Sequence, residues 1–254
     1  MKVNLPGFAG GDRTSLDLPK AQQFLLERME ATGKPVIVVL FSGSALAVNW
    51  AQQHAVAIIQ AWYPGEEGGT AIADTIAGKN NPGGRLPVTF YTGIEQLPRF
   101  ENYDMTGRTY RFFHGQPLYP FGFGLSYTSF AYGDLQVSTN SLAAGQKLSV
   151  HTRVTNTGDR EGDEVAQLYV EQPGGKPVSQ RALRGFARVH LNPKESRVVS
   201  FELNARDLSS VDADGSRSVN PGLYRIFLGG GQPDTKAAGT HATLTVKGRH
   251  PLEP

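Results

Sequence analysis

The sequence predicts an α/β domain followed by an all-β sandwich, and two patterns along the chain carry that prediction. In the first half, apolar runs of strand length alternate with helical stretches at the spacing of β–α–β units. In the second half, short strands of alternating apolar and polar residues recur between turn signals. The change falls near residue 125, which gives predicted domains of residues 1–125 and 126–254.

The first half is expected to build a partial α/β sandwich with a mostly parallel sheet. Ala21, Leu25 and Met29 recur at i, i+4 and i+8 with Phe24 beside them, which predicts one apolar helix face. The unbroken β-branched run that follows is typical of a strand buried on both faces. The expected helices begin near residue 19 and cover 45–53 and 68–77, and the expected strands cover 36–40, 55–62 and 86–91.

Residues 92–126 lose this periodicity and are rich in aromatic residues, proline and glycine. A long irregular segment of that composition is typical of a packed functional loop, because a plain linker would be polar.

The second half is expected to form a β-sandwich of immunoglobulin or fibronectin III type with six or seven strands. Tyr224 follows a Pro-Gly turn and has two interpretations, a tyrosine corner or an ordinary buried tyrosine. The strongest strand patterns lie at residues 148–154, 166–170, 199–203, 224–228 and 243–246.

Composition excludes several classes of function. The net charge is +2, from 25 basic and 23 acidic side chains that are interspersed, so no basic face for nucleic acid is expected. The absence of cysteine excludes thiolate catalysis, disulfides and cysteine-ligated zinc. The six histidines are scattered without metal-ligand spacing, so neither a metal nor a cofactor is expected. The N-terminal residues carry no signal-peptide pattern, no membrane span is expected, and the compartment stays open.

Two motifs in the first half have a structural and a functional interpretation. Residues 41–45 (Phe-Ser-Gly-Ser-Ala) lie at a strand-to-helix turn, where backbone N–H groups can hold an anion. They lack the glycines of a dinucleotide or P-loop site, so we favour a structural turn and disfavour a nucleotide-binding domain. Glu66 and Glu67 precede a predicted helix, and favourable interaction with the helix N-terminus explains this pair without catalysis.

Asp12 and Arg13 follow two glycines, a combination that lets the backbone approach a ligand closely. The two side chains could contact a sugar hydroxyl or orient a catalytic group. They could equally form a local ion pair before the first helix.

Four segments in the same order resemble glycoside hydrolase family 3, in the β-glucosidase and β-xylosidase branches. Residues 11–19 (Gly-Asp-Arg-Thr-Ser-Leu-Asp-Leu-Pro) resemble the start of a helix in the family's second domain. Residues 62–69 and 81–90 (Asn-Pro-Gly-Gly-Arg-Leu-Pro-Val-Thr-Phe) are similar to its most recognisable stretch. Residues 107–113 resemble a loop of these branches, and residues 119–128 the junction into a fibronectin III-like domain.

The resemblance implies an exo-acting retaining β-glycosidase that hydrolyses terminal non-reducing β-D-glucosyl or β-D-xylosyl residues. Such an enzyme needs a nucleophile Asp and an acid/base Glu. The family carries the Asp on a preceding (β/α)8 barrel and the Glu shortly before the segment that matches Gly10 to Arg13. Residues 1–9 contain no acid. We therefore expect both catalytic carboxylates, the barrel and the first strands of the α/β domain upstream of Met1, and no activity from this chain alone.

The residues expected to support the sugar site are Asp12 and Arg13, with Arg108, Tyr110 and Arg111 as weaker candidates. The aromatic loop around these weaker candidates could instead join the two domains. The expected partners are a β-linked oligosaccharide or aryl glycoside and the missing barrel, with neither nucleic acid nor membrane. The parent enzyme is expected to be periplasmic or secreted. The alternative is a non-catalytic module that binds carbohydrate or protein.

Overall fold

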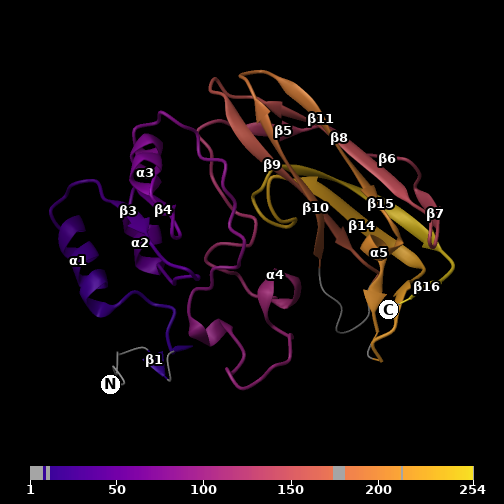
Figure 1. Cartoon of the computed structure of the whole chain (residues 1–254), viewed down its shortest axis with the longest axis horizontal. Helices are drawn as coiled ribbons and strands as arrows, with labels where there is room; N and C mark the ends of the chain where they lie inside the picture. Colours follow the sequence, from indigo (N-terminus) through magenta and orange to yellow (C-terminus); the bar gives the residue numbers. More distant parts are fainter. Residues whose placement is uncertain (1–7, 10–11, 174–180, 213, 254) are drawn as a thin grey trace. The chain divides into compact units, whose positions relative to one another are not determined.

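Two parallel strands, β3 (Ile37–Leu40) and β4 (Ala57–Gln60), form a two-stranded sheet in the first half, in register from Ile37 opposite Ala57 to Leu40 opposite Gln60. The computed structural model describes residues 8–9, 12–173, 181–212 and 214–253 (Figure 1). The other elements of this half are β1 (Phe8–Ala9), β2 (Asp12–Arg13), α1 (Lys20–Glu30), α2 (Asn49–His54), α3 (Gly68–Ile76), the 3-10 helix η1 (Ile94–Gln96) and α4 (Thr109–Phe112).

The chain divides into two compact units that interleave along the sequence. The first comprises residues 1–80, 88–109 and 113–120, and the second comprises residues 81–87, 110–112 and 121–254. The predicted boundary between residues 125 and 126 stays a prediction. No helix in the described residues is both long and apolar enough to cross a membrane.

The strand at residues 36–40 was expected to be buried on both faces, and this expectation is wrong. Val38 and Leu40 are 5% and 6% exposed, whereas Ile37 on the opposite face is 42% exposed and Val39 is half-buried. Alternate side chains of a strand point to opposite faces, so a strand with one covered face buries every second residue. The covered face packs with Leu46, Val48 and Ala51 into the small core of this unit.

The apolar stripe of α1 also lies differently from a buried face. Phe24, Leu25 and Met29 are 62%, 58% and 52% exposed, and no residue of α1 is fully buried. Leu26, on another side of the helix, packs against the small core instead. The helix ends as expected near Gly33, whose φ of +71° is the left-handed conformation that terminates helices.

The strand expected at residues 86–91 is absent from the described residues. Phe90 forms only an isolated antiparallel bridge with Tyr119, in which each N–H donates to the other carbonyl at 2.9 and 3.1 Å. Pro87 explains the interruption, because it has no N–H to donate to a ladder. Helix α2 likewise begins later than expected, at Asn49. Glu67 is the N-cap residue of α3 but makes no side-chain capping hydrogen bond.

The second half is a β-sandwich, as predicted. One sheet has the order β10-β9-β14-β15-β7, the other has β11-β8-β5 with β6 also paired to β8, and a small sheet has β12-β13-β16. Its elements are β5 (Phe130–Tyr132), β6 (Gln136–Val137), β7 (Ser141–Ala143), β8 (Leu148–Asn156), β9 (Gly162–Glu171), β10 (Ala182–Leu191), β11 (Ser196–Leu203), α5 (Ala205–Leu208), β12 (Ser210–Val211), β13 (Arg217–Val219), β14 (Gly222–Gly229), β15 (Gly239–Lys247) and β16 (His250–Leu252).

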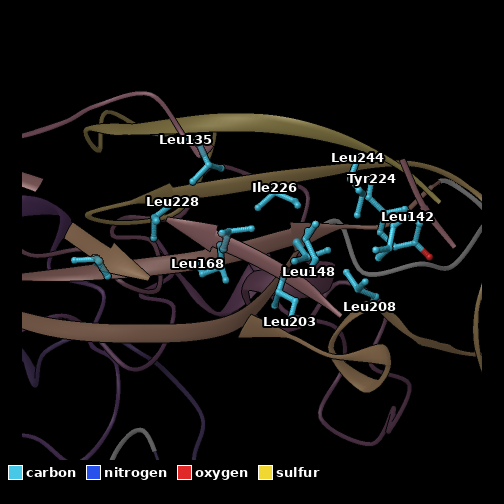
Figure 2. Packing of buried hydrophobic residues seen from close by; sticks show 14 of the residues in the cluster. Leu135, Leu142, Leu148, Leu168, Leu203, Leu208, Tyr224, Ile226, Leu228 and Leu244 are labelled. Carbon is cyan, nitrogen blue, oxygen red and sulfur yellow. The ribbon is translucent and has the colours of Figure 1, made fainter. Parts of the chain in front are cut away.

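The core of the sandwich is built from alternate residues of its strands. Figure 2 shows Leu148, Leu168 and Ile226 directed into this core, and all three are fully buried. Tyr224 is 1% exposed and its hydroxyl donates to the Asn220 carbonyl at 2.8 Å. A hydrogen bond back to the chain a few residues upstream is the defining contact of a tyrosine corner, which decides between the two interpretations of this residue.

Residues 81–87 are fastened to the sandwich by a buried ion pair. Arg85 Nη2 lies 2.6 Å from Glu164 Oε2, and the side chains are 10% and 4% exposed. The other carboxylate oxygen of Glu164 accepts from the Tyr132 hydroxyl at 2.7 Å. Arg85 also donates to the carbonyls of Gly83, Gly84 and Gly230. This segment is therefore a structural part of the second unit.

Candidate functional site at the carboxyl ends of the parallel strands

The carboxyl ends of β3 and β4 are joined by polar contacts. Gln60, the last residue of β4, donates from Nε2 to the carbonyl and the hydroxyl of Ser42 at 3.3 and 3.1 Å. Ser42 in turn donates to the Ser44 carbonyl at 2.9 Å. Ligands of open α/β sheets bind outside the carboxyl ends of the strands. We call this edge, with residues 13, 41–45 and 60–63, the strand-end rim.

Arg13 completes the rim from a distant part of the chain. Its Nη1 donates to the Ser44 hydroxyl at 2.9 Å and to the Ala45 carbonyl at 3.2 Å. The backbone nearby is held too, since Ala47 N–H donates to the Leu16 carbonyl at 2.8 Å. Arg13 therefore fixes the turn after β3. The two glycines before Asp12, and the side chain of Asp12 itself, lie outside the described residues.

Trp62 follows β4 with a φ of +55°, in the left-handed region that bulky residues rarely adopt. Such strain persists where surrounding contacts enforce it and is concentrated at functional sites. The Trp62 ring packs edge-on against Phe90, with ring centroids 6.2 Å apart. Tyr63 is 76% exposed and lies so close to Gly43 that an added Cβ there would come within 2.9 Å of the ring. The close approach requires glycine at position 43.

One acceptor on the rim has no donor. Gln60 Oε1 is buried and receives no hydrogen bond from the described residues. An unsatisfied buried acceptor costs free energy, so it calls for a bound water or a ligand hydroxyl. The polar groups described on the rim are thus a guanidinium, hydroxyls and an amide. They can hold a hydroxylated ligand or a neighbouring loop, but they include no carboxylate for acid or base catalysis.

Arg108 has a different role in the same unit. Its guanidinium donates to the carbonyls of Arg99, Asn102 and Asp104 at 3.1, 2.5 and 3.2 Å, and so closes the loop of residues 99–108. The next residue, Thr109, donates its N–H to the Tyr91 hydroxyl at 3.0 Å. Burial raises the pKa of Tyr91, which keeps this phenol neutral. These contacts fix the conformation of the loop, and the aromatic side chains of the loop are exposed.

Tyr110 and Arg111 belong to the second unit. The Tyr110 ring stacks on Phe121 at a centroid distance of 4.3 Å, and its hydroxyl accepts from Leu183 N–H at 3.1 Å. The Arg111 guanidinium lies 5.5 Å from the centre of the Phe112 ring. Tyr110 thus fills a packing position. The supporting role in a sugar site that the sequence suggests for these residues stays a prediction.

Gln60 and Trp62 were not among the residues selected from the sequence. A polar residue at the end of an apolar strand was a usable signal for Gln60, because strand ends carry the sites of parallel sheets. The left-handed conformation of Trp62 has no sequence signature. Among the described residues, no three His, Asp or Glu side chains lie together as a metal site would require.

Comparison of the sequence with models of known protein families identifies the domains that it contains. Residues 4–127 match the model of the glycosyl hydrolase family 3 C-terminal domain, and residues 164–232 match that of the fibronectin type III-like domain. The chain belongs to glycosyl hydrolase family 3. The family model thus covers both the strand-end rim and the loop that Arg108 closes.

Relatives in the family are longer than this chain. A xylan 1,4-β-xylosidase of Xylanibacter ruminicola is 44% identical over 90% of the chain but 26% of its own length. A periplasmic β-glucosidase of Salmonella typhimurium is 37% identical over 85% of the chain and 30% of its own length. The solved β-glucosidase 3B of Thermotoga neapolitana, in complex with α-D-glucose, superposes with a TM-score of 0.84 at 31% identity, over 96% of the chain and 36% of that structure. The chain therefore spans about a quarter to a third of these relatives.

Proposed function

We propose that this chain is the C-terminal part of an exo-acting retaining β-glycosidase that removes terminal non-reducing β-D-glucosyl or β-D-xylosyl residues. The observation that supports this proposal is the match to β-xylosidases and β-glucosidases across nearly the whole chain. The proposed substrates are β-linked oligosaccharides or aryl glycosides. The proposed intramolecular partner is an N-terminal (β/α)8 barrel that carries the nucleophile.

The rim supports this reaction without performing it. Retaining hydrolysis needs a nucleophilic carboxylate and an acid/base carboxyl group about 5–5.5 Å apart. The described rim offers Arg13, Ser42, Ser44 and Gln60, none of which can take either role. We assign Arg13, together with Asp12, to positioning the turn after β3 beside the sugar site. We assign Arg108 to fixing the conformation of the loop of residues 99–108. Tyr110 and Arg111 are assigned to fixing the segment that follows this loop.

The decisive experiment is an assay of the chain alone with p-nitrophenyl β-D-glucoside and β-D-xyloside. These activated substrates reduce the need for a general acid but not for a nucleophile, so they are the most favourable test. We expect no turnover above buffer from the chain alone, and turnover from a longer protein that contains it behind a barrel. Turnover by the chain that disappears in Asp12→Asn or Glu67→Gln would overturn the proposal.

In the longer protein, substitution of Arg13 tests whether this residue positions the site or takes part in catalysis. Arg13→Gln removes the contacts to Ser44 and Ala45, and we expect it to lower kcat/KM about tenfold to hundredfold, the usual effect of a misplaced supporting group. The pH profile should stay unchanged, because the titrating carboxyl groups are untouched. A shifted pH profile would instead place Arg13 against a catalytic carboxyl group.

A second candidate function, a non-catalytic carbohydrate-binding module, is favoured by one observation. The loop that Arg108 closes exposes Phe100 and Tyr103, which are 72% and 89% accessible. Within this loop, Asp104 accepts from both the N–H and the hydroxyl of Thr106. Exposed rings on a pre-shaped loop can stack on pyranose faces. Chemical-shift changes of the Asn102 and Asp104 backbone amides with xylobiose or cellobiose, lost in Tyr103→Ala but retained in the exposed control Phe186→Ala, would support this candidate.

A further inference from the structure

Two exposed aromatic side chains belong to the strand-end rim. Phe41 follows directly after β3 and is 58% exposed, and Tyr63 lies three residues after the end of β4 and is 76% exposed. Strands β3 and β4 are paired up to Leu40 and Gln60, so both aromatic residues follow the same edge of the sheet. Ligands of open parallel sheets bind outside this edge. An aromatic ring displayed there is a candidate contact surface for a ligand.

The backbone around Tyr63 presents its ring in one place. Trp62 before it has the left-handed φ of +55°, and the Trp62 ring packs edge-on against Phe90. A Cβ added to Gly43 would lie 2.9 Å from the Tyr63 ring carbon Cε2 and 3.6 Å from the Tyr63 hydroxyl. Backbone strain persists where surrounding contacts enforce it, and it is concentrated at ligand-binding sites. The strained turn thus holds the Tyr63 ring beside Gly43 and leaves most of the ring accessible to a ligand.

A hydroxyl donor lies next to this ring. Ser44 follows Gly43, is exposed, and accepts from Arg13 Nη1 at 2.9 Å. Among the hydrogen bonds of the described residues, the Ser44 hydroxyl acts only as an acceptor, so its proton can be donated to a ligand. A pyranose offers an apolar face of C–H groups to an aromatic ring, and hydroxyls around its rim to polar groups. An accessible ring with an accessible hydroxyl beside it fits such a ligand.

We propose that Tyr63 is a stacking platform for a sugar on the leaving-group side of the scissile bond, and that Ser44 donates to a hydroxyl of that sugar. The inference rests on the proposed glycosidase function. An exo-acting enzyme encloses the terminal sugar in a pocket, whereas the remaining sugars extend toward solvent. A ring that is 76% exposed does not enclose a terminal sugar, but it supports one that stays partly solvated. The ligand class is therefore a β-linked disaccharide or a longer oligosaccharide, bound through its reducing-end sugars.

Binding is tested in the chain itself, because both contact residues lie within it. The backbone amides of Gly43 and Ser44 are followed by NMR during titration with xylobiose or cellobiose. A single stacked ring gives weak binding, so we expect saturable shifts with a Kd on the order of 10 mM. The shifts should be lost in Tyr63→Ala but retained in Tyr63→Phe, which keeps the ring. They should also be retained in the control Phe186→Ala, which removes a ring that is 69% exposed in the second unit.

A kinetic measurement on the longer protein separates the platform from the reaction. A β-D-xylosyl or β-D-glucosyl fluoride has no leaving-group sugar, whereas xylobiose and cellobiose each have one. Tyr63→Ala should lower the ratio of kcat/KM for the disaccharide to kcat/KM for the matching fluoride about tenfold, mainly through KM, because a stacking contact is lost on one substrate only. Tyr63→Phe should restore most of this ratio.

Several outcomes would overturn the proposal. They are the absence of saturable shifts at Gly43 and Ser44 in the wild-type chain, loss of binding in Tyr63→Phe as complete as in Tyr63→Ala, and an unchanged kinetic ratio in Tyr63→Ala. A Tyr63→Ala chain that is unfolded by circular dichroism counts against it too, because an exposed platform contributes little to stability. Failure of the proposed function has a different signature, since the longer protein would then hydrolyse neither disaccharide nor fluoride. Shifts that persist in that case would leave a sugar site on the rim but remove its assignment to a leaving group.

Discussion

The buried ion pair of Arg85 and Glu164 attaches residues 81–87 to the second unit. Both carboxylate oxygens of Glu164 are used, by Arg85 and by the Tyr132 hydroxyl. Burial and the adjacent carboxylate raise the pKa of Tyr132, so its phenol remains a donor at any physiological pH. Removing one member of such a network leaves the other charged and unpaired, whereas removing both does not.

We therefore predict that Arg85→Met destabilises the second unit by about 3–5 kcal/mol. The double variant Arg85→Met/Glu164→Leu should recover most of that loss, because no uncompensated charge remains. Urea unfolding of the two variants and the wild type measures the difference. An Arg85→Met protein within about 1 kcal/mol of the wild type would show that the pair contributes no more than a surface ion pair does.

Asp163, next to Glu164, gives a prediction about pH. Partial burial opposes its ionisation, but hydrogen bonds from His190 and Arg188 outweigh this effect and lower the Asp163 pKa below its ordinary value. A carboxyl group with a lowered pKa stabilises the folded state above its unfolded pKa, and that contribution is lost as pH falls through the folded value. We expect stability of the second unit to decrease below about pH 4. Asp163→Asn should flatten this acid dependence, with the exposed Asp134→Asn as comparison.

At the scale of elements, α1 presents an exposed apolar face among the described residues. Phe24, Leu25 and Met29 were expected on an apolar face and do share one, but that face is exposed. We predict that the chain self-associates through it, because contiguous exposed apolar surface favours association. Leu25→Glu should shift the chain toward the monomer in light scattering, whereas Gln23→Glu, which adds the same charge on the opposite side of the helix, should not. A monodisperse wild-type monomer would contradict this expectation.

Elements in which the pattern of apolar and polar residues matches the burial of those residues in the structure could be predicted from the sequence. The other elements could not. Strand β8 alternates buried and exposed residues along its length, and the sequence shows the same alternation. Strand β10 was not predicted, because Arg184 and Gly185 interrupt its pattern at the bulge. The extent of burial in the α/β core was overestimated. A β-branched run such as residues 36–40 indicates that a segment tends to be buried, but it does not show which neighbouring elements are present to cover it. Arg13 was selected from the sequence, but its partners in the turn after β3 lie more than thirty positions away along the chain and could not be predicted.

At the scale of the molecule, the sandwich extends beyond its own continuous sequence. Residues 81–87 and 110–112 belong to the second unit, and they carry Arg85 and Tyr110. We predict that a fragment of residues 130–248 unfolds at lower urea concentration than the second unit does within the whole chain. In that fragment Glu164→Gln should be stabilising, because Arg85 is missing, whereas in the whole chain the same change should be destabilising. Equal effects in both contexts would show that Arg85 does not govern Glu164.

The interleaving of the two units bears on how such chains can be exchanged by recombination. A crossover placed just after residue 125 would transfer the strands of the sandwich but leave Arg85 behind with the other parent. A foreign segment at positions 81–87 would then have to supply a guanidinium that meets a buried carboxylate it did not evolve beside. Viable chimeras should therefore inherit positions 85 and 164 from the same parent. Because the residues at positions 85 and 164 must match, we expect that one half of this chain cannot be replaced by that of a relative without a loss of stability.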